Sequence, residues 1–394
     1  MSGVKNKLKK ILSVFGLKIT KDFKIIPLLR LNVFNTNCLK KVLISYITEP
    51  FFKKNDFSHT NLQECHAAAE IFKEQGYNVD VVDHFADITI DYSQYEIVYG
   101  MGKVLEKSFH YNNVAIKRIF YATGCSPIYS NERTLVRVRN FYDLHEVNLL
   151  SSSRFVADSF YLQTFLSNGV IVLGNDLVLN TYKNYDKQGA DRYKNLSAFF
   201  YDVYDIDLAE KDFSKARKHF LWFGSSGLLH KGLDLLLDIF SERPDICLHI
   251  CGAAKNEKEF FDCYKSTLSK SNNIINHGFV DIRSDEFKKL MDQCAFVLSP
   301  SVSEGGSPAV LNTIANGGLI PIITRASGLD INNFGVIIEE PEFESVRIAI
   351  DKALLLDNDQ LLNMAITAKN NIRTEYTYEK YKESLKNLIK NIIN

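Results

Sequence analysis

The sequence predicts an α/β protein with two domains, each built around a largely parallel β-sheet. Its 394 residues are more than one ordinary hydrophobic core holds. Short apolar runs of strand length alternate with segments of helical periodicity, which is the pattern of repeated βαβ units. This alternation stops in a Tyr- and Asp-rich stretch at residues 195–218 and then starts again. We therefore expect one domain at residues 41–212, a second at residues 213–375 and a separate amphipathic helix at residues 376–394.

The composition is that of a globular protein, with 46% hydrophobic and 24% charged residues. No apolar run approaches the roughly 20 residues that span a bilayer. Seven cysteines, an odd number in a long chain, indicate a reducing compartment without a disulfide framework. We therefore expect a cytoplasmic protein. The formal net charge is zero, and its uneven distribution favours a surface-seeking terminus over nucleic-acid binding.

Residues 1–40 form a basic amphipathic extension. Residues 1–41 hold ten Lys or Arg and a single acidic residue, Asp22. Between the lysines, apolar residues recur at helical spacing: Val4, Leu8, Ile11, Leu12 and Phe15. Such a helix can lie in the plane of an anionic membrane surface, which would involve residues 1–30 and the inner face of the membrane. It can equally dock on the protein's own domain, and both alternatives stay open. The interleaved lysines do not fit the order of a signal peptide.

The first domain is expected to bind its ligand at the carboxyl ends of its strands, as open parallel sheets do. Strands are predicted at residues 42–47, 77–82, 96–99, 118–123, 154–157 and 170–173, with a helix at residues 61–75. Small or polar residues that follow these strands are candidates for contacting an acceptor substrate: His59, Asn61, Gly124, Ser126, Arg133 and Asn175. Capping or solvated roles are the alternative for His59 and Arg133. The absence of a G-x-G-x-x-G loop argues against an NAD-binding domain.

The second domain contains a loop suited to a polyhydroxylated, phosphorylated ligand. An apolar strand at residues 295–298 leads into a Ser- and Gly-rich loop, then a short helix and a strand at residues 319–323. Ser307 is the expected N-cap of that helix, with Pro308 at its first position. The amides of Gly305, Gly306 and Ser307 would point out of a helix N-terminus, where they attract anions and hydroxyl oxygens. Glu304 adds a carboxylate acceptor beside them.

A second loop of this domain is predicted to bind phosphate. It follows a strand at residues 219–223 and reads Gly224-Ser225-Ser226-Gly227, with His230 and Lys231 leading into an apolar helix. Small residues let backbone amides approach a phosphate, and the lysine supplies charge where a leaving group accumulates it. Further strands are expected at residues 246–251, 274–280 and 336–338, with helices at residues 285–292 and two more within 342–371.

The motif S-x-x-E-G-x-x-P…N-G-x-x-x-P resembles the Glu-(seven residues)-Glu region of retaining glycosyltransferases of family four, which have the GT-B fold. The resemblance implies two Rossmann-like domains with sheets facing an interdomain cleft, and a C-terminal helix that crosses back to the first domain. It implies that Glu304 holds sugar hydroxyls of the donor. The family's second glutamate falls on Asn312, which would hold the ribose through neutral hydrogen bonds.

The Gly-Ser-Ser-Gly…His-Lys-Gly segment resembles the family's diphosphate-binding segment, which carries Gly-Arg…Lys-Gly. Lys231 matches the lysine, whereas the arginine position falls on Ser225. An arginine from the other domain, or His230, is the expected replacement. The family's nucleobase-lining segment falls on Phe279 and Val280. The resemblance covers about residues 220–375 well and the first 215 residues only loosely.

The expected function is transfer of a sugar, of hexosyltransferase type, from a nucleotide-diphosphate sugar to a glycan or lipid-linked glycan. By resemblance the configuration is retained, no cofactor or metal is required, and the pathway is bacterial surface polysaccharide or glycoconjugate synthesis, such as lipopolysaccharide or capsule. Glu304 and Lys231 are the expected catalytic residues. Asp205-Ile206-Asp207 lies in a linker and is a weak metal motif. Cys247 and Cys251 are expected as buried thiols of a strand rather than metal ligands.

Two other functions stay open. A GT-B sugar-nucleotide 2-epimerase would need several carboxylates around the sugar, and only Glu304 is placed convincingly. A non-catalytic sugar-nucleotide or glycan-binding protein would explain the departures from the family pattern at Ser225 and Asn312. Donor turnover separates the transferase from the binding protein, because both would bind the nucleotide.

Overall fold

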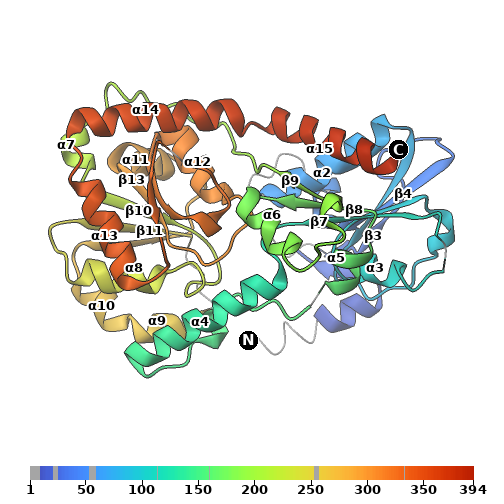
Figure 1. The fold of residues 1–394 in the computed structure, drawn as a ribbon, viewed down its shortest axis with the longest axis horizontal. Helices are drawn as coiled ribbons and strands as arrows, with labels where there is room; N and C mark the ends of the chain where they lie inside the picture. The colour runs from blue at the N-terminus through green and yellow to red at the C-terminus, as the bar shows by residue number, and fades with distance from the viewer. Residues whose placement is uncertain are drawn as a thin grey trace.

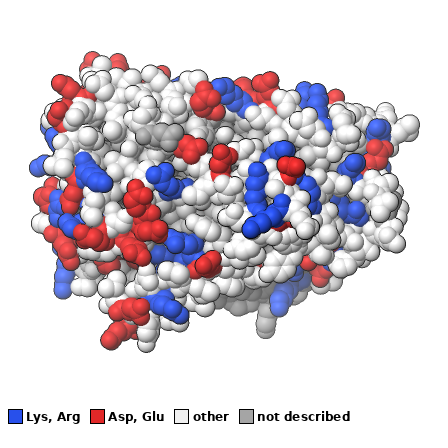
Figure 2. Space-filling view, in the orientation of Figure 1, with Lys and Arg blue, Asp and Glu red and all other residues white. Residues whose placement is uncertain are grey.

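The chain folds into two lobes, and a pair of C-terminal helices runs along one side of both (Figure 1). The computed structural model describes residues 9–20, 25–52, 59–112, 114–158, 160–252, 257–331 and 333–394. Each lobe is centred on one parallel-rich sheet. The predicted α/β class with two sheets is confirmed. Acidic and basic side chains are interspersed on the face drawn in Figure 2, so no single-sign field dominates that face.

The N-terminal lobe contains a seven-stranded sheet in the order β3-β5-β4-β6-β7-β8-β9. Its strands are β3 (Leu29–Arg30), β4 (Lys40–Tyr46), β5 (Tyr77–Asp83), β6 (Ile97–Gly100), β7 (Lys117–Ala122), β8 (Gly169–Leu173) and β9 (Tyr193–Leu196). The helices of this lobe are α2 (Thr60–Glu74), α3 (Gly102–Ser108), α4 (Pro127–His145), α5 (Tyr161–Leu166) and α6 (Asp176–Lys183). All neighbouring strands are parallel except β3, which is antiparallel to β5.

The C-terminal lobe contains a six-stranded parallel sheet in the order β12-β11-β10-β13-β14-β15. Its strands are β10 (His219–Phe223), β11 (Cys247–Cys251), β12 (Ile274–Gly278), β13 (Phe296–Ser299), β14 (Ile320–Thr324) and β15 (Val336–Ile338). The helices are α7 (Phe213–Ala216), α8 (Leu233–Ser241), α9 (Lys258–Cys263), α10 (Lys265–Lys270), α11 (Asp285–Gln293), α12 (Pro308–Gly317), α13 (Phe343–Leu354) and α14 (Asn358–Glu375). Strands such as β14 are buried along their whole length, as expected for a sheet covered on both faces.

The predicted strand at residues 154–157 is wrong. This segment pairs with no strand and instead lies along α4, where the Asn131 side chain accepts a hydrogen bond from the backbone amide of Val156 at 2.8 Å and donates one to its carbonyl oxygen at 2.9 Å. The sheet continues beyond β8 with β9, which the sequence pattern did not reveal. The two middle residues of β9 are polar and exposed, so it lacks the apolar run that marks the other strands.

The C-terminal helix α15 (Tyr378–Ile393) packs on the N-terminal lobe, as the family resemblance implies. Thr377 caps its start, and the buried stripe is Tyr381, Leu385 and Ile389. The hydroxyl of Tyr381 lies 3.1 Å from that of Tyr121 in β7. Two lysines of α15 pair with glutamates of α2: Lys382 with Glu70 at 2.8 Å and Lys386 with Glu74 at 2.6 Å.

Helix α4 crosses from the N-terminal lobe to the C-terminal lobe (Figure 1). Arg137 forms an ion pair with Asp234 of α8, and their side chains are only 4% and 3% exposed. Phe141, one turn further, lies in the hydrophobic core of the C-terminal lobe. An exposed pair, Arg133 with Glu340, joins the lobes nearby. The lobes are therefore held together by buried contacts between α4 and the C-terminal lobe, as well as by the segments that connect them.

The predicted N-terminal helix is only partly within the described residues. Val4, Lys5, Lys7 and Leu8 lie outside them, as does Asp22. Residues 9–14 are helical, and a short antiparallel pair of β1 (Leu17–Ile19) with β2 (Ile25–Pro27) follows. Nowhere in the described part of the chain is a helix both long and apolar enough to span a bilayer. All seven cysteines are free thiols.

Candidate active site

The two loops singled out by the sequence lie side by side at the carboxyl ends of β10 and β13, which are neighbours in the C-terminal sheet. The loop after β10 carries Lys231, and the loop after β13 carries Glu304. Lys231 forms an ion pair with Oε1 of Glu304, although 73 residues separate them. Parallel strands end at the same edge of a sheet, which is why two distant loops meet there.

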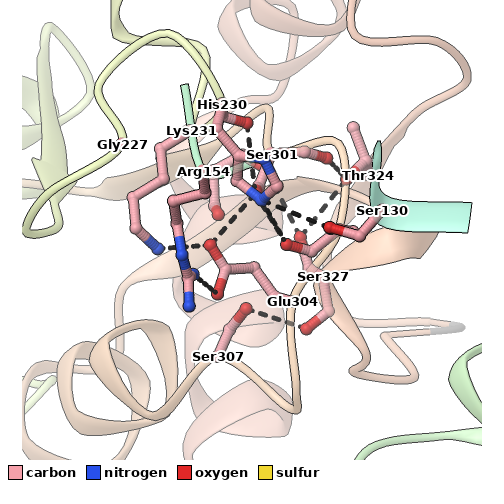
Figure 3. Close-up of polar contacts among 12 residues, drawn as sticks. Ser130, Arg154, Gly227, His230, Lys231, Ser301, Glu304, Ser307, Thr324 and Ser327 are labelled. Carbon is pink, nitrogen blue, oxygen red and sulfur yellow. Dashed lines mark hydrogen bonds and ion pairs between the residues drawn. The ribbon is translucent and has the colours of Figure 1, made fainter. Parts of the chain in front are cut away.

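Glu304 is the centre of a charged cluster that spans both lobes (Figure 3). Its Oε1 also accepts a hydrogen bond from the hydroxyl of Ser301 at 3.1 Å. Its Oε2 accepts one from Arg154 at 3.2 Å. Burial alone would raise the pKa of this carboxyl, but the charges of Lys231 and Arg154 outweigh burial and lower the pKa of Glu304 to about 2. The carboxylate is therefore ionised at neutral pH.

Arg154 is the functional candidate that the sequence reasoning did not identify. It comes from the segment that lies along α4, and half of its side chain is exposed. A Cβ added to Gly227 would collide with the Arg154 side chain, so this glycine lets the arginine reach the loop after β10. The sequence did lead us to expect an arginine from the other domain in place of the one missing at Ser225, and Arg154 meets that description.

His230 lies behind the cluster and holds the two loops together. Its ring nitrogens lie 3.0 Å from the hydroxyl of Thr134 in α4 and 2.8 Å from the carbonyl oxygen of Ser303. Burial lowers the pKa of His230 to about 4, so the imidazole is neutral at pH 7. The side chain is 1% exposed. His230 therefore positions the loops and does not offer the positive charge that the sequence left open for it.

The Gly-rich loop before α12 lies against the backbone of the N-terminal lobe. A Cβ on Gly305 would collide with the carbonyl oxygen of Thr123, which precedes Gly124 at the end of β7. Gly306 has a φ of +74°, which favours glycine, and a Cβ there would be 2.8 Å from Cβ of Ala198. The loop can approach the other lobe this closely only because it lacks side chains.

Comparison with known proteins identifies the C-terminal half. The sequence of residues 207–372 matches the family described as Glycosyl transferases group 1. These residues are a glycosyl transferases group 1 domain. No protein among those with curated descriptions matches the chain.

Solved structures share the GT-B fold of this glycosyltransferase. Sucrose-phosphate synthase from Thermosynechococcus elongatus has a TM-score of 0.63 and 11% identity, covering 90% of this chain and 98% of that one. HepE from Anabaena, in complex with UDP and glucose, has a TM-score of 0.57 and 14% identity, covering 89% and 99%. A TarM mutant from S. aureus, in complex with Fondaparinux, alpha-GlcNAc-glycerol and UDP, has a TM-score of 0.53 and 15% identity, covering 96% and 69%.

The side chain of Asn312, which the resemblance implies would hold the ribose, is hydrogen-bonded within the protein. Its side chain is 5% exposed. The amide oxygen accepts a hydrogen bond from the backbone amide of Tyr201 at 2.8 Å, and the amide nitrogen donates to the carbonyl oxygen of Pro308 at 2.8 Å. One turn later, Asn316 binds the backbone of residues 201, 203 and 204. Both asparagines therefore attach residues 201–204, which connect the lobes, to α12, and the ribose role of Asn312 stays a prediction.

Ser307 is the N-cap residue of α12 and Pro308 follows it in the first turn, as predicted, but the Ser307 side chain makes no capping hydrogen bond. It has a φ of +41°, and its hydroxyl donates a hydrogen bond to the carbonyl oxygen of Ser327 at 2.8 Å rather than capping α12. Its contact with Ser327 instead ties the start of α12 to the turn after β14. The structure thus holds the Gly305-Gly306-Ser307 backbone rigidly beside Glu304.

The loop after β10 presents fewer amides than expected. The Gly224 amide donates to the carbonyl oxygen of Cys251 at 3.1 Å. The Gly227 amide donates to Glu257 at 2.6 Å. Ser225 and Ser226 are exposed and form the part of the loop open to a ligand. Of the predicted nucleobase contacts, Phe279 is 73% exposed and Val280 is 3% exposed, so Val280 is a core residue and only Phe279 can reach a base.

The acceptor-side candidates divide between structural and boundary positions. His59 accepts a hydrogen bond from the amide of Asn61 at the start of α2, which is a capping role. Ser126 is buried and caps α4. Three other residues lie where the lobes meet. Gly124 lies against the Glu304–Gly305 backbone, Arg133 pairs with Glu340, and Asn175 donates to Asp330 at 2.9 Å.

Proposed function

We propose that this glycosyltransferase moves a sugar from a nucleotide-diphosphate sugar to a glycan or lipid-linked glycan acceptor, with retention of configuration and without a metal. The observation that carries the proposal is the carboxylate of Glu304 held between Lys231 and Arg154 at the rim of the C-terminal sheet. With His230 neutral, these groups sum to one positive charge. A site with one carboxylate and an excess of cationic charge suits a ligand that has both sugar hydroxyls and a diphosphate.

Each group has a defined task in this proposal. The Glu304 carboxylate accepts hydrogen bonds from hydroxyls of the donor sugar. Lys231 and Arg154 then release Glu304 in part and bind the diphosphate oxygens, where negative charge grows as the sugar departs. A phosphate oxygen of the leaving group accepts the acceptor's proton, which explains why the site needs no separate base. The proposal places the acceptor on the opposite side of the boundary, near Gly124, Arg133 and Asn175.

Of the two alternatives, the epimerase fits the structure less well. An epimerase would need several carboxylates beside the sugar, and Glu304 alone of the predicted site residues supplies one. A protein that only binds sugar nucleotides would use the same two cations to hold the diphosphate, so donor turnover is what separates it from the transferase. HepE, in complex with UDP and with UDP-glucose, supports UDP as the first nucleotide to test. Surface polysaccharide synthesis is proposed as the pathway on the family resemblance.

A thermal-shift panel of UDP, GDP, ADP, CMP and dTDP tests the donor site. One nucleotide, expected to be UDP, should stabilise the wild type by about 2.7 kcal/mol at a hundred times its Kd, a shift of a few degrees. Arg154→Ala should raise the Kd of that nucleotide by tenfold or more, since a hydrogen bond to a charged group contributes about 1.5–3 kcal/mol. The exposed Arg139→Ala, on α4, is the matched control and should bind like the wild type.

The same panel can refute the proposal. If no nucleotide stabilises the wild type, the donor site is absent and the glycan-binding alternative leads. If Arg154→Ala binds as tightly as Arg139→Ala, the second cation comes from elsewhere. Turnover of a nucleotide sugar that carries the best-binding nucleotide must then be measured, because binding alone does not distinguish an enzyme from a binding protein.

We further propose that residues 1–30 attach the protein to an anionic membrane on its cytoplasmic face. Ile11, Val14 and Phe15 are 55%, 83% and 72% exposed, and Lys9 and Lys10 beside them are exposed too. An apolar face flanked by lysine is the composition of an in-plane membrane helix. The described part of the helix does not bury this stripe on the protein's own domain.

Flotation with vesicles tests the membrane proposal. The full chain should float with vesicles containing phosphatidylserine and much less with neutral phosphatidylcholine vesicles, because lysines near a surface contribute about 1 kcal/mol each through its negative potential. A variant lacking residues 1–15 keeps β1 and should lose this flotation. Equal flotation of the two proteins would remove the N-terminal helix from the membrane contact.

A further inference from the structure

Three histidines lie in a row on neighbouring strands of the C-terminal sheet, away from the Glu304 cluster. His219 opens β10, His249 lies in β11 and His277 lies in β12. The ring centroids of His219 and His249 are 5.2 Å apart, and those of His249 and His277 are 5.3 Å apart. Cys247 lies two residues before His249 on the same face of β11, because side chains alternate along a strand. The glycosyltransferase mechanism uses none of these side chains.

A chain of hydrogen bonds fixes which nitrogen of His249 has a free lone pair. Glu286 of α11 accepts from Nδ1 of His277 at 3.0 Å. With Nδ1 donating to Glu286, Nε2 of His277 is the nitrogen left to accept a hydrogen bond from Nδ1–H of His249, which lies 3.0 Å away. The lone pair of His249 is therefore on Nε2. A metal-binding histidine usually donates its other ring N–H to a fixed acceptor, and here His277, held by Glu286, is that acceptor for His249.

Two further metal-ligand atoms lie close to that nitrogen. Nε2 of His249 lies 2.9 Å from Nδ1 of His219 and 3.6 Å from Sγ of Cys247. All three ligand atoms lie within 4.8 Å of one another. A tetrahedral zinc ion, with bonds of about 2.0–2.1 Å to nitrogen and about 2.3 Å to sulfur, separates its ligands by about 3.3–3.6 Å. The distance from His249 to Cys247 already fits this geometry, whereas the distance from His219 to His249 must widen by a few tenths of an ångström, and His219 and Cys247, at most 4.8 Å apart, must come to about 3.6 Å.

We propose that Cys247, His219 and His249 bind one Zn²⁺ ion, with water as the fourth ligand. A thiolate with two imidazoles is a donor set that favours zinc over magnesium or calcium. His219 and Cys247 are only half-buried, so the ion can enter from solvent and a water ligand has room. The amide nitrogen of Gln293 lies 3.4 Å from Nδ1 of His219, at this open side. Binding releases the Cys247 thiol proton to solvent.

The zinc ion would stabilise the lobe and take no part in sugar transfer. His219 begins β10, whereas the loop towards Lys231 leaves its opposite end, so the ion lies at the far end of that strand from the charged cluster. It would join β10 to β11 directly, and through His277 and Glu286 it would join them to the edge strand β12 and to α11. The sequence analysis expected Cys247 as a buried thiol and did not connect it with histidines on other strands.

Titration of the metal-free full chain with Co²⁺ and Zn²⁺ tests this site. The wild type should bind one ion per chain and show the near-ultraviolet charge-transfer band of a cobalt thiolate. Cys247→Ser should lose the band, and His219→Gln should lose binding at micromolar metal. Cys263→Ser, which removes an exposed thiol of the same lobe, should leave the cobalt band and the metal affinity unchanged. Wild-type protein that binds neither ion at micromolar concentration would overturn the proposal.

A second variant separates a metal site from three histidines that only hydrogen-bond to one another. His277→Gln keeps all three ligands but breaks the chain to Glu286, so zinc affinity should fall by about 10- to 100-fold. Zinc should also raise the Tm of the wild type and not that of Cys247→Ser. The assignment of these side chains would be contradicted if the two single variants, Cys247→Ser and His219→Gln, both bound metal as fully as the wild type. Unchanged zinc affinity in His277→Gln would contradict it as well.

Discussion

Glu304→Gln is expected to lower the rate of sugar transfer by two or more orders of magnitude. The loss corresponds to about 3 kcal/mol of transition-state stabilisation, because a neutral amide replaces the charged acceptor of the sugar hydroxyls. The amide oxygen can still accept from Lys231 and Ser301, so the fold should survive. Steady-state kinetics of wild type and variant, with the nucleotide sugar chosen from the thermal-shift panel, measure the effect.

Glu344→Gln is the matched control, because Glu344 is also a glutamate paired with an arginine, Arg347, but is 63% exposed and lies outside the proposed site. It should transfer sugar at nearly the wild-type rate. A Glu304→Gln enzyme as active as this control would place the site elsewhere.

The lowered pKa of Glu304 also predicts how activity depends on pH. Because the pKa of this carboxyl is about 2, the carboxylate stays ionised to well below pH 4. Any loss of activity between pH 7 and pH 5 must therefore come from another group.

Arg137→Ala is expected to lower the free energy of unfolding by about 3–5 kcal/mol. The substitution leaves the carboxylate of Asp234 buried without its partner, at a site where both side chains were less than 5% exposed. The pair is not fully hydrogen-bonded even in the wild type, since Arg137 Nε and Asp234 Oδ1 are buried without partners. Urea denaturation followed by far-ultraviolet circular dichroism measures the change.

Two further variants identify the cause of that loss. Arg133→Ala breaks an exposed pair on the same helix and should cost no more than about 1 kcal/mol. Combining Arg137→Met with Asp234→Leu removes both charges and should recover most of the stability, because a buried pair contributes little once its desolvation is counted. If Arg137→Ala destabilises no more than Arg133→Ala, α4 is not fastened to α8 through this pair.

The parts of the site that sequence could predict are those specified by local pattern. Lys231 and Glu304 each follow an apolar strand through a loop of small residues, and parallel strands bring such loops to one edge. Arg154 could not be found this way, because its segment forms no strand and its contact depends on how the lobes meet. The contacts that Asn312 makes could not be predicted for a related reason. The partner of its side chain is the backbone of residue 201, which no local pattern connects to α12.

Some signals were present but were not combined. Asn312 and Asn316 are four residues apart on a largely apolar helix, a spacing that places two amides on one buried face. Cys247 and His249 are two residues apart on a strand, which places them on one side of the sheet. The register that sets His219 opposite Cys247 is a tertiary property. The fold was therefore accessible from periodicity, whereas the contacts between lobes and between strands were not.

Helix α15 has a consequence for how the protein is made. Its buried stripe of Tyr381, Leu385 and Ile389 completes the core of the N-terminal lobe, yet the whole C-terminal lobe precedes it in the chain. During synthesis, domains generally fold in order from the N-terminus. The first lobe of this protein must instead leave the ribosome with an apolar face uncovered and wait for the second lobe to be translated. Until α15 emerges, that face is the surface on which a chaperone would bind.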